Sequence, residues 1–229
     1  MNKIRTLALL CFPLTAHADW QDVVDYVGDT FRVSISKENY LEQNYDNELT
    51  YTLYGSHNFN ETWRVFGQYD SDHFGELGIG YSFIVADLIY NEVTVAAGGN
   101  LDDVDVYNAG LFSAFAWEDA VFYTDITVQY IDQEHYFFRD ESISLDKTIG
   151  SFYDVNDWLS LSLSYTHQMT HYNKLTGNHL KWYGDGGYSH YLSPGVTVSI
   201  FGVKPTVSYN YYFDTPEHNT IDFNLTFDF

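Results

Sequence analysis

The chain has 229 residues, with 32 acidic side chains against 10 basic ones and a formal net charge of −22 at pH 7. A surface with this charge repels nucleic acids and anionic lipid headgroups, so the composition argues against nucleic-acid binding. Two interpretations of the charge are open, namely solubility in a salty habitat, or a route or site for cations.

The first 18 residues predict an export signal. Lys3 and Arg5 precede a short apolar segment, and Ala16-His17-Ala18 then matches the small-residue pattern of a cleavage site. We therefore expect residues 1–18 to be a cleaved signal peptide and residues 19–229 to form a single domain. The single cysteine lies within the signal, so no disulfide is expected in the exported chain.

Period-two alternation of apolar and polar residues recurs along most of residues 19–229, and it indicates β-strands with one apolar face. Leu159, Leu161 and Leu163, for example, alternate with serines. No segment there has the roughly 18 apolar residues of a membrane helix. The pattern predicts twelve strands, near residues 31–37, 48–59, 63–69, 75–83, 90–98, 105–115, 121–131, 142–152, 158–169, 179–191, 196–213 and 219–229.

The stretch 196–213 changes phase along its length. Val196 and Val198 share one phase, whereas Val207 and Tyr209 share the other. Either a bulge near Gly202–Pro205 reverses the register, or two strands meet there. We favour the bulge, which keeps the count at twelve.

Short and long connections alternate along the chain. The short ones are predicted at 58–61, 86–88, 117–119, 154–157 and 192–195, and the longer polar ones at 70–73, 99–105, 132–141, 170–178 and 214–219. This is the layout of an outer-membrane barrel, with short periplasmic turns and longer extracellular loops. A secreted β-sandwich would also produce alternation. The sandwich is disfavoured because the polar faces carry Ser, Thr, Asn, Gly and acids on nearly every strand.

A cleaved signal, alternating strands and a last strand ending in Phe229 resemble the outer-membrane β-barrel proteins of Gram-negative bacteria. In size and strand count the chain is similar to the small twelve-stranded monomeric porins, such as the oligogalacturonate and sialic-acid channels. The resemblance implies an all-β, closed antiparallel transmembrane β-barrel in the outer membrane, surrounded by lipid and lipopolysaccharide. It also implies a monomer whose last strand is recognised by the barrel-assembly machinery. Those channels are lined with basic residues, and this acidic chain departs from them.

Aromatic side chains are expected at the membrane interface near the periplasmic strand ends. They are Phe59, Trp63, Trp117, Trp158 and Phe229. On the inward phase, by contrast, acids predominate. The residues expected there are Glu48, Glu76, Glu92, Asp125, Asp146, Asp185 and Asp222, with Arg64 and Lys181 as the basic members.

An acidic wall of this kind attracts cations, so we predict a channel for passive diffusion of small cationic or neutral solutes, without a cofactor. A lumen plugged by pairing of its carboxylates with Arg64, Lys181, Tyr and Ser is the structural alternative. The functional alternative is a closed barrel that displays acidic, Tyr-rich loops for adhesion or partner binding.

Catalysis and dedicated metal binding are not expected. Ser189 and His190 are adjacent, so a strand directs them to opposite faces. Asp102, Asp103 and Asp105 supply oxygen ligands of the kind that Ca²⁺ and Mg²⁺ prefer, but they lack the ligand spacing of a calcium motif. We therefore predict neither an enzyme nor a metal site.

Overall fold

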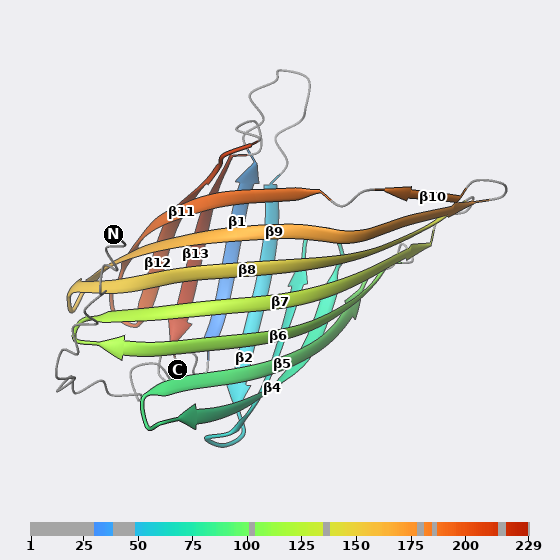
Figure 1. Ribbon diagram of the computed structural model, residues 1–229. Helices are drawn as coiled ribbons and strands as arrows, with labels where there is room; N and C mark the ends of the chain where they lie inside the picture. Colours follow the sequence, from blue (N-terminus) through green and yellow to red (C-terminus); the bar gives the residue numbers. More distant parts are fainter. Residues whose placement is uncertain are drawn as a thin grey trace, which may run out of the picture.

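The computed structural model describes residues 30–38, 49–100, 104–134, 138–177, 181–184, 187–214 and 219–228. They form one antiparallel sheet (Figure 1). Its strands are β1 (Thr30–Glu38), β2 (Leu49–Asn58), β3 (Trp63–Asp70), β4 (Gly75–Val85), β5 (Ile89–Gly99), β6 (Val104–Trp117), β7 (Ala120–Glu134), β8 (Phe138–Asn156), β9 (Leu159–Gly177), β10 (Lys181–Gly184), β11 (Tyr188–Val198), β12 (Val203–Tyr212) and β13 (Thr220–Asp228). Among the described residues, no helix is both long and apolar enough to span a membrane.

Twelve of these strands close into a barrel. Each strand pairs with its neighbour in the chain, β9 pairs with β11, and β13 pairs with β1 to complete the circuit. The closing pair runs in register from Thr30 opposite Asp228 to Glu38 opposite Thr220. The short β10 lies outside the circuit and pairs with β9 alone. The predicted closed antiparallel barrel of twelve strands is thereby confirmed.

The outer face of the barrel is apolar and exposed. On β4, Leu77 is 73% exposed, and Ile79 and Tyr81 are exposed as well, whereas the alternate residues Glu76 and Gly80 are buried. Large exposed apolar side chains occur in the same phase on the other strands of the circuit. So much contiguous apolar surface is rarely left in contact with water, and a lipid-facing wall accounts for it.

The region after residue 188 differs from the prediction. The phase change between Val198 and Val203 is a tight turn, in which Ile200 and Val203 exchange two backbone hydrogen bonds, so the predicted bulge is wrong. Phe201 and Gly202 take positive φ angles of 51° and 81° there, the left-handed region that Gly tolerates without strain.

The predicted turn at residues 192–195 is also wrong, because these residues lie inside β11. Pro194 pairs with Leu163 on β9, while the ladder to β12 is interrupted at Ser193 and Pro194. Proline has no N–H to donate, and the gap lies where that donor is missing. The total stays at twelve because residues 188–198 and 203–212 each supply one barrel strand.

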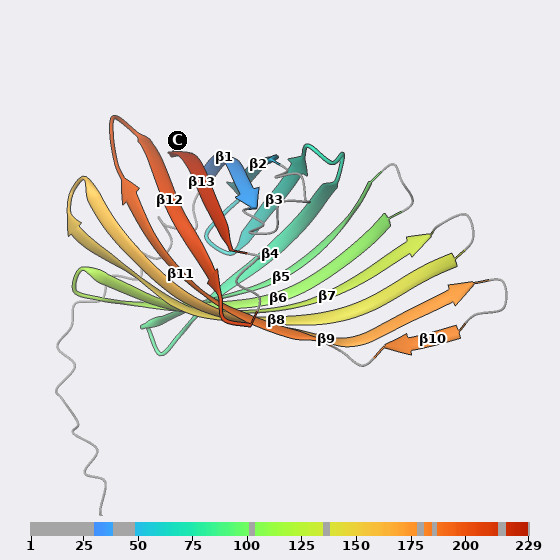
Figure 2. The same cartoon turned by 90° about the horizontal axis from the view of Figure 1, so that it is seen from above.

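The three longest strands exceed what a membrane crossing requires. β8 and β9 have 19 residues each and β7 has 15, against about 9–11 for a transmembrane strand. Their loop-side ends continue beyond the barrel, with β10 along the edge (Figure 2). We call this part the extension, formed by residues 130–134, 138–143, 172–177 and 181–184. At its base, Ile143 and Ser144 pair with Tyr172 and Thr170, so His171 forms a bulge.

The turn between β11 and β12 gives a first prediction. Gly202→Ala should lower the free energy of unfolding by about 1–2 kcal/mol, because a Cβ disfavours the left-handed conformation. The measurement is the urea midpoint, by tryptophan fluorescence, of protein folded into phosphatidylcholine vesicles. Gly187→Ala is the matched control, since a Cβ at that glycine meets no atom within 4 Å. Equal midpoints for the two variants would contradict the assignment of this turn.

Candidate functional site in the barrel lumen

The inward-facing side chains surround a cavity of about 320 Å³. Strands β1, β2, β3, β5, β6 and β7 all contribute to its wall. The charged residues of the wall are Arg32, Arg64, Glu92 and Asp125, and the aromatic ones are Tyr54, Phe66 and Phe112. Two basic and two acidic side chains of the described lumen therefore line the same cavity.

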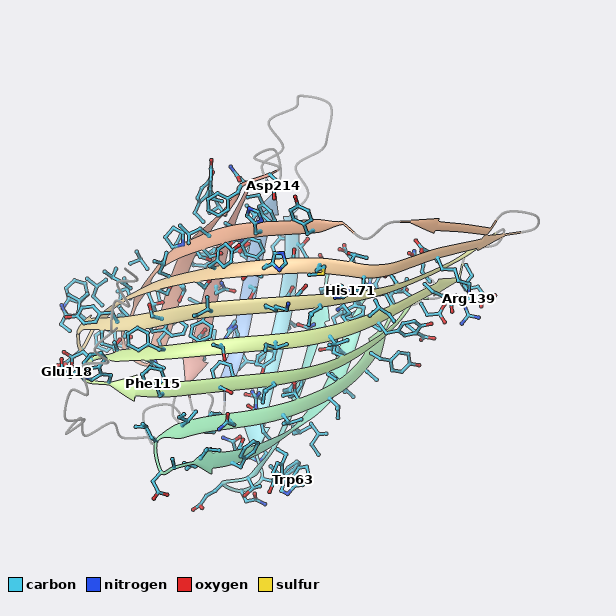
Figure 3. All side chains as sticks on the ribbon, viewed as in Figure 1. Trp63, Phe115, Glu118, Arg139, His171 and Asp214 are labelled. Carbon is cyan, nitrogen blue, oxygen red and sulfur yellow. The ribbon has the colours of Figure 1, made fainter. Side chains whose placement is uncertain are left out.

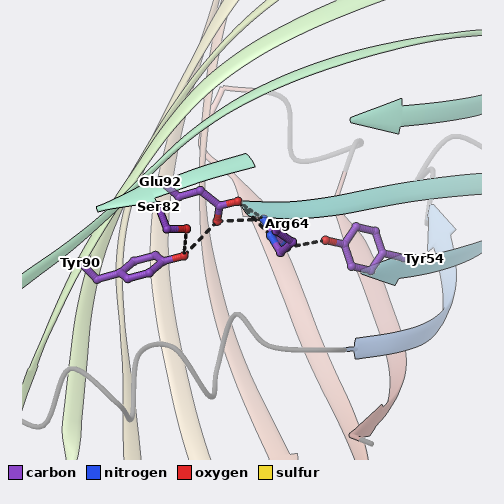
Figure 4. Close-up of polar contacts among 5 residues, drawn as sticks. All are labelled: Tyr54, Arg64, Ser82, Tyr90 and Glu92. Atoms are coloured by element: carbon purple, nitrogen blue, oxygen red, sulfur yellow. Dashed lines mark hydrogen bonds and ion pairs between the residues drawn. The ribbon is translucent and has the colours of Figure 1, made fainter. Parts of the chain in front are cut away.

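Glu92 and Arg64 form a bidentate ion pair on this wall (Figure 4). Arg64 donates from Nε and Nη2 to the two carboxylate oxygens over 2.9 and 3.0 Å, and from Nη1 to the Tyr54 hydroxyl over 3.0 Å. The Tyr90 hydroxyl reaches the same carboxylate at 3.4 Å. Glu92 is only 1% exposed, so this pair is a structural element of the wall rather than a solvated charge.

A glycine makes room for the pair. Gly80 on β4 lies opposite Arg64 on β3, and a Cβ built on it would be 1.8 Å from Oε1 of Glu92. The carboxylate of Glu92 on β5 thus extends across the bare backbone of β4 to reach β3. The guanidinium also lies 5.1 Å from the ring centre of Phe66, which covers the pair from one side.

The other inward acids bind neutral partners. Glu76 accepts a hydrogen bond from Asn108. The remaining three contacts are Thr127 to Asp125 at 3.1 Å, Gln168 to Asp146 at 3.3 Å and Asn210 to Asp222 at 2.6 Å. Donors of this kind leave the negative charge in place. Asp125 and Asp146 are diagonal neighbours on β7 and β8, since Asp125 pairs with Thr148 and Thr127 with Asp146.

Two inward cations were not predicted from the sequence. Arg32 on β1 and Lys204 on β12 both pair with Thr226 on β13, so they flank one position of the wall. The Arg32 guanidinium lies 5.5 Å from the ring centre of Tyr54. The alternation of Phe31 with Arg32 could have revealed the first cation, whereas Lys204 lies within the predicted bulge at Gly202–Pro205, which left its phase undecided.

Several predicted site residues are not brought into the lumen. Lys181 belongs to β10 in the extension and is thus separated from the barrel circuit. Glu48, Asp185, Phe229, Asp102 and Asp103, like the predicted signal peptide, lie outside the described residues. Asp105 is exposed at the loop-side start of β6. The interface aromatics Phe59, Trp63, Trp117 and Trp158 are all exposed at the turn side.

The two adjacent residues that could take part in catalysis, Ser189 and His190, lie on opposite faces of the barrel wall. Ser189 faces inward and donates to Gln168 at 3.2 Å, whereas His190 faces outward and packs against Phe213. Over the described part of the chain, no three His, Cys, Asp or Glu side chains come close enough to share a metal ion.

The extension carries a second set of charges, of which Arg139 is exposed and Asp132, Glu141 and Lys174 are half-buried. Asp132 accepts two hydrogen bonds from Arg139, and Glu141 binds Lys174 and the Tyr130 hydroxyl. The hydrogen bonds from Arg139 hold the pKa of Asp132 below its ordinary value, and the Lys174 ammonium does the same for the pKa of Glu141. Figure 3 shows Arg139 far from Trp63 and Glu118, which mark the turn side.

The chain matches solved structures by fold. The NanC porin aligns with a TM-score of 0.61 at 10% identity, covering 88% of this chain and 100% of that one. The KdgM porin, solved with disordered oligogalacturonate, gives 0.56 at 10% identity with 87% and 99% covered. An outer membrane channel from Pseudomonas putida F1 gives 0.60 at 9% identity with 88% and 96% covered.

No family model and no curated protein sequence matches the chain. At about 10% identity the structural likeness concerns the fold, which is that of the small outer-membrane barrels. Together with the apolar outer face, this fold places the protein in the outer membrane, as predicted.

The buried ion pair generates a second prediction. Arg64→Met should cost about 3–5 kcal/mol of unfolding free energy, because it leaves Glu92 charged, buried and without its partner. The double variant Arg64→Met/Glu92→Met should cost less, since no buried charge remains. Urea unfolding in vesicles measures both, and a single variant that is as stable as the double one would show that Glu92 does not depend on Arg64.

The extension generates a third prediction. Because the pKa values of Asp132 and Glu141 are lowered in the folded state, their stabilising effect is present above about pH 4 and is lost as the pH falls through the lowered values. Amide hydrogen exchange of residues 138–143, corrected for intrinsic rates, should therefore show less protection at pH 3 than at pH 7. The Arg139→Gln/Lys174→Gln variant should lack this pH dependence, and a wild type without it would contradict the prediction.

Proposed function

We propose that this protein is a porin-like outer-membrane channel for passive diffusion of small cationic or neutral solutes. The observation that carries the proposal is the cavity of about 320 Å³ inside a closed twelve-stranded barrel, lined by charged and polar side chains. Twelve strands enclose more space than the eight-stranded barrels that side chains fill, and less than the sixteen-stranded porins. The channels from the structural comparison support the same role.

The charge of the wall supports a preference for cations. Glu76, Asp125, Asp146 and Asp222 are hydrogen-bonded to neutral donors, whereas Glu92 is compensated by Arg64. Arg32 and Lys204 offset part of this charge, so the proposed preference is moderate and neutral solutes pass as well. Acidic linings concentrate cations in a narrow path and repel anions.

A passive channel requires no catalytic group, and the proposal assigns none. We further propose that the protein is exported, that its signal peptide is cleaved and that the mature barrel is a monomer. The assembly machinery is proposed to bind the last strand, which ends in Phe229.

Oligogalacturonate, an acidic sugar, accompanies the KdgM porin in its structure. The acids in this lumen favour solutes of the opposite charge.

The extension supports a second candidate function. Strands β8 and β9 continue well past the length that a membrane crossing needs, and ion pairs order the surface of this part. Such a surface suits a closed barrel that displays its outer side to a host surface, a phage or a partner protein. In that case the lumen would carry no current.

Planar-bilayer recordings test the channel. The wild type should give steady currents with a cation-selective reversal potential in a KCl gradient. A carboxylate about 7 Å from the ion attracts a cation and repels an anion by about 0.6 kcal/mol each in water, so losing each of Asp125 and Asp146 should lower the cation-to-anion permeability ratio about sevenfold. The Asp125→Asn/Asp146→Asn variant should therefore be nearly unselective, and Arg32→Gln should shift the ratio the other way.

Asp132→Asn is the matched control, because Asp132 lies in the extension and away from the lumen. Currents whose reversal potential is unchanged by the Asp125 and Asp146 substitutions would refute the selectivity. An electrically silent wild type would refute the channel and favour the display function.

A further inference from the structure

A row of paired, outward-facing residues climbs the barrel wall from the turn side. Trp63 on β3 begins the row, one residue after the turn that joins β2 to β3. It pairs with Tyr81, and successive pairs lead to Val93, Leu111 and Ile126 on β5, β6 and β7. All five side chains are apolar or aromatic and exposed, as expected of a lipid-facing surface.

The same row then becomes polar. Ile126 pairs with Lys147 on β8, Lys147 with His167 on β9, and His167 with His190 on β11. The row ends at Phe213, whose N–H donates to the His190 carbonyl just beyond the loop-side end of β12. One strip of the wall thus changes from apolar to basic and hydrogen-bonding partway across the membrane.

Lys147 lies within the apolar belt rather than at its edge. It is the sixth of nine positions in a row that spans the belt, so with a belt of about 25 Å its Cα lies about 9 Å below the loop-side edge. Leu145 and Ile149 flank it on the same face of β8, and Ile149 is exposed. The next charged position on this face of β8 is Glu141, six residues towards the extension.

No protein group neutralises this lysine among the described residues. The ion pairs found there join Arg64 to Glu92, Arg139 to Asp132 and Lys174 to Glu141, and Asp214 contacts His190. An ammonium group in lipid without a counter-charge is unfavourable. A lysine side chain of this length can extend towards the headgroup level, where its partner must lie.

The neighbouring histidines supply further donors. The rings of His167 and His190 have centroids 6.4 Å apart, and Tyr188 stacks beside His190 at 6.2 Å. His190 Nδ1 lies 3.3 Å from Asp214, which leaves Nε2 for a second partner. One ammonium, two imidazoles and a phenol therefore lie along a rising line near the external side.

We propose that Lys147, His167 and His190 bind the phosphate of a lipid in the external leaflet, with its acyl chains along the apolar wall of β8 and β9. Phosphate is the headgroup anion that suits an ammonium with adjacent N–H donors. The basic side chains of the site act at short range, so the site can hold an anion although the chain as a whole is acidic. This lipid site is on the outer wall and does not depend on the channel proposal.

A second copy of the chain fits this surface less well. A two-fold contact would bring two Lys147 ammonium groups together, which is repulsive. The described acids on the outward side lie at the loop-side ends or in the extension and not at the depth of Lys147; they are Asp105, Asp132, Glu134, Glu141 and Asp214, the neighbour of His190. Charge complementarity therefore favours a lipid phosphate as the occupant.

Native mass spectrometry of the full detergent-solubilised barrel tests the site, with lipid A bearing two phosphates as the probe and dephosphorylated lipid A as its match. The wild type should bind the phosphorylated lipid at least tenfold more tightly. Lys147→Leu should abolish that difference, and Lys147→Arg should retain it. Lys204→Leu, which removes a lysine from the inner face, should have no effect.

Folding does not confuse the result, because leucine suits a lipid-facing position and the urea midpoint of Lys147→Leu in phosphatidylcholine vesicles should equal or exceed that of the wild type. Equal binding of both lipids by the wild type, or unchanged preference in Lys147→Leu, would overturn the proposal. So would competition by equimolar inorganic phosphate, or a wild-type dimer that Lys147→Leu converts to a monomer without altering lipid binding.

Discussion

The requirement that every backbone N–H and C=O in lipid find a partner within the protein underlies the whole structure. The closing pair between β13 and β1 meets it, because this pair removes the last free edge of the twelve-stranded circuit. Once the sheet is closed, alternate side chains on each strand have two environments, lipid outside and the lumen inside. The apolar outer face and the polar inner face follow from that geometry and not from a hydrophobic core.

Closure also brings distant charges together inside the barrel. Arg64 and Glu92 are 28 residues apart in the chain, yet β3 and β5 hold them in a bidentate pair across the bare backbone at Gly80. This pair compensates one acid of the lumen, while the acids hydrogen-bonded to Thr127, Gln168, Asn108 and Asn210 have neutral partners. The proposed selectivity therefore depends on which acids the fold leaves uncompensated, rather than on how many it contains.

The tilt of the strands has a different consequence on the outside. Because paired residues climb from the turn side at Trp63 to the loop side at Phe213, a single row samples the full depth of the membrane. Lys147 occupies an intermediate depth in that row, and His167 and His190 continue it towards the headgroups. A charge that looks misplaced on one strand thus becomes part of a surface that only neighbouring strands complete.

The sequence by itself determined the barrel class, the count of twelve strands and the inward phase of residues such as Asp125, because period-two alternation is local and survives without the fold. It did not determine the turn at Phe201 and Gly202, since a change of phase fits a turn as well as a bulge. The pairing of Arg64 with Glu92 and the alignment of Lys147 with His167 were decided by the tertiary structure alone. Both depend on the register between strands, which closure of the complete barrel sets and no single strand contains.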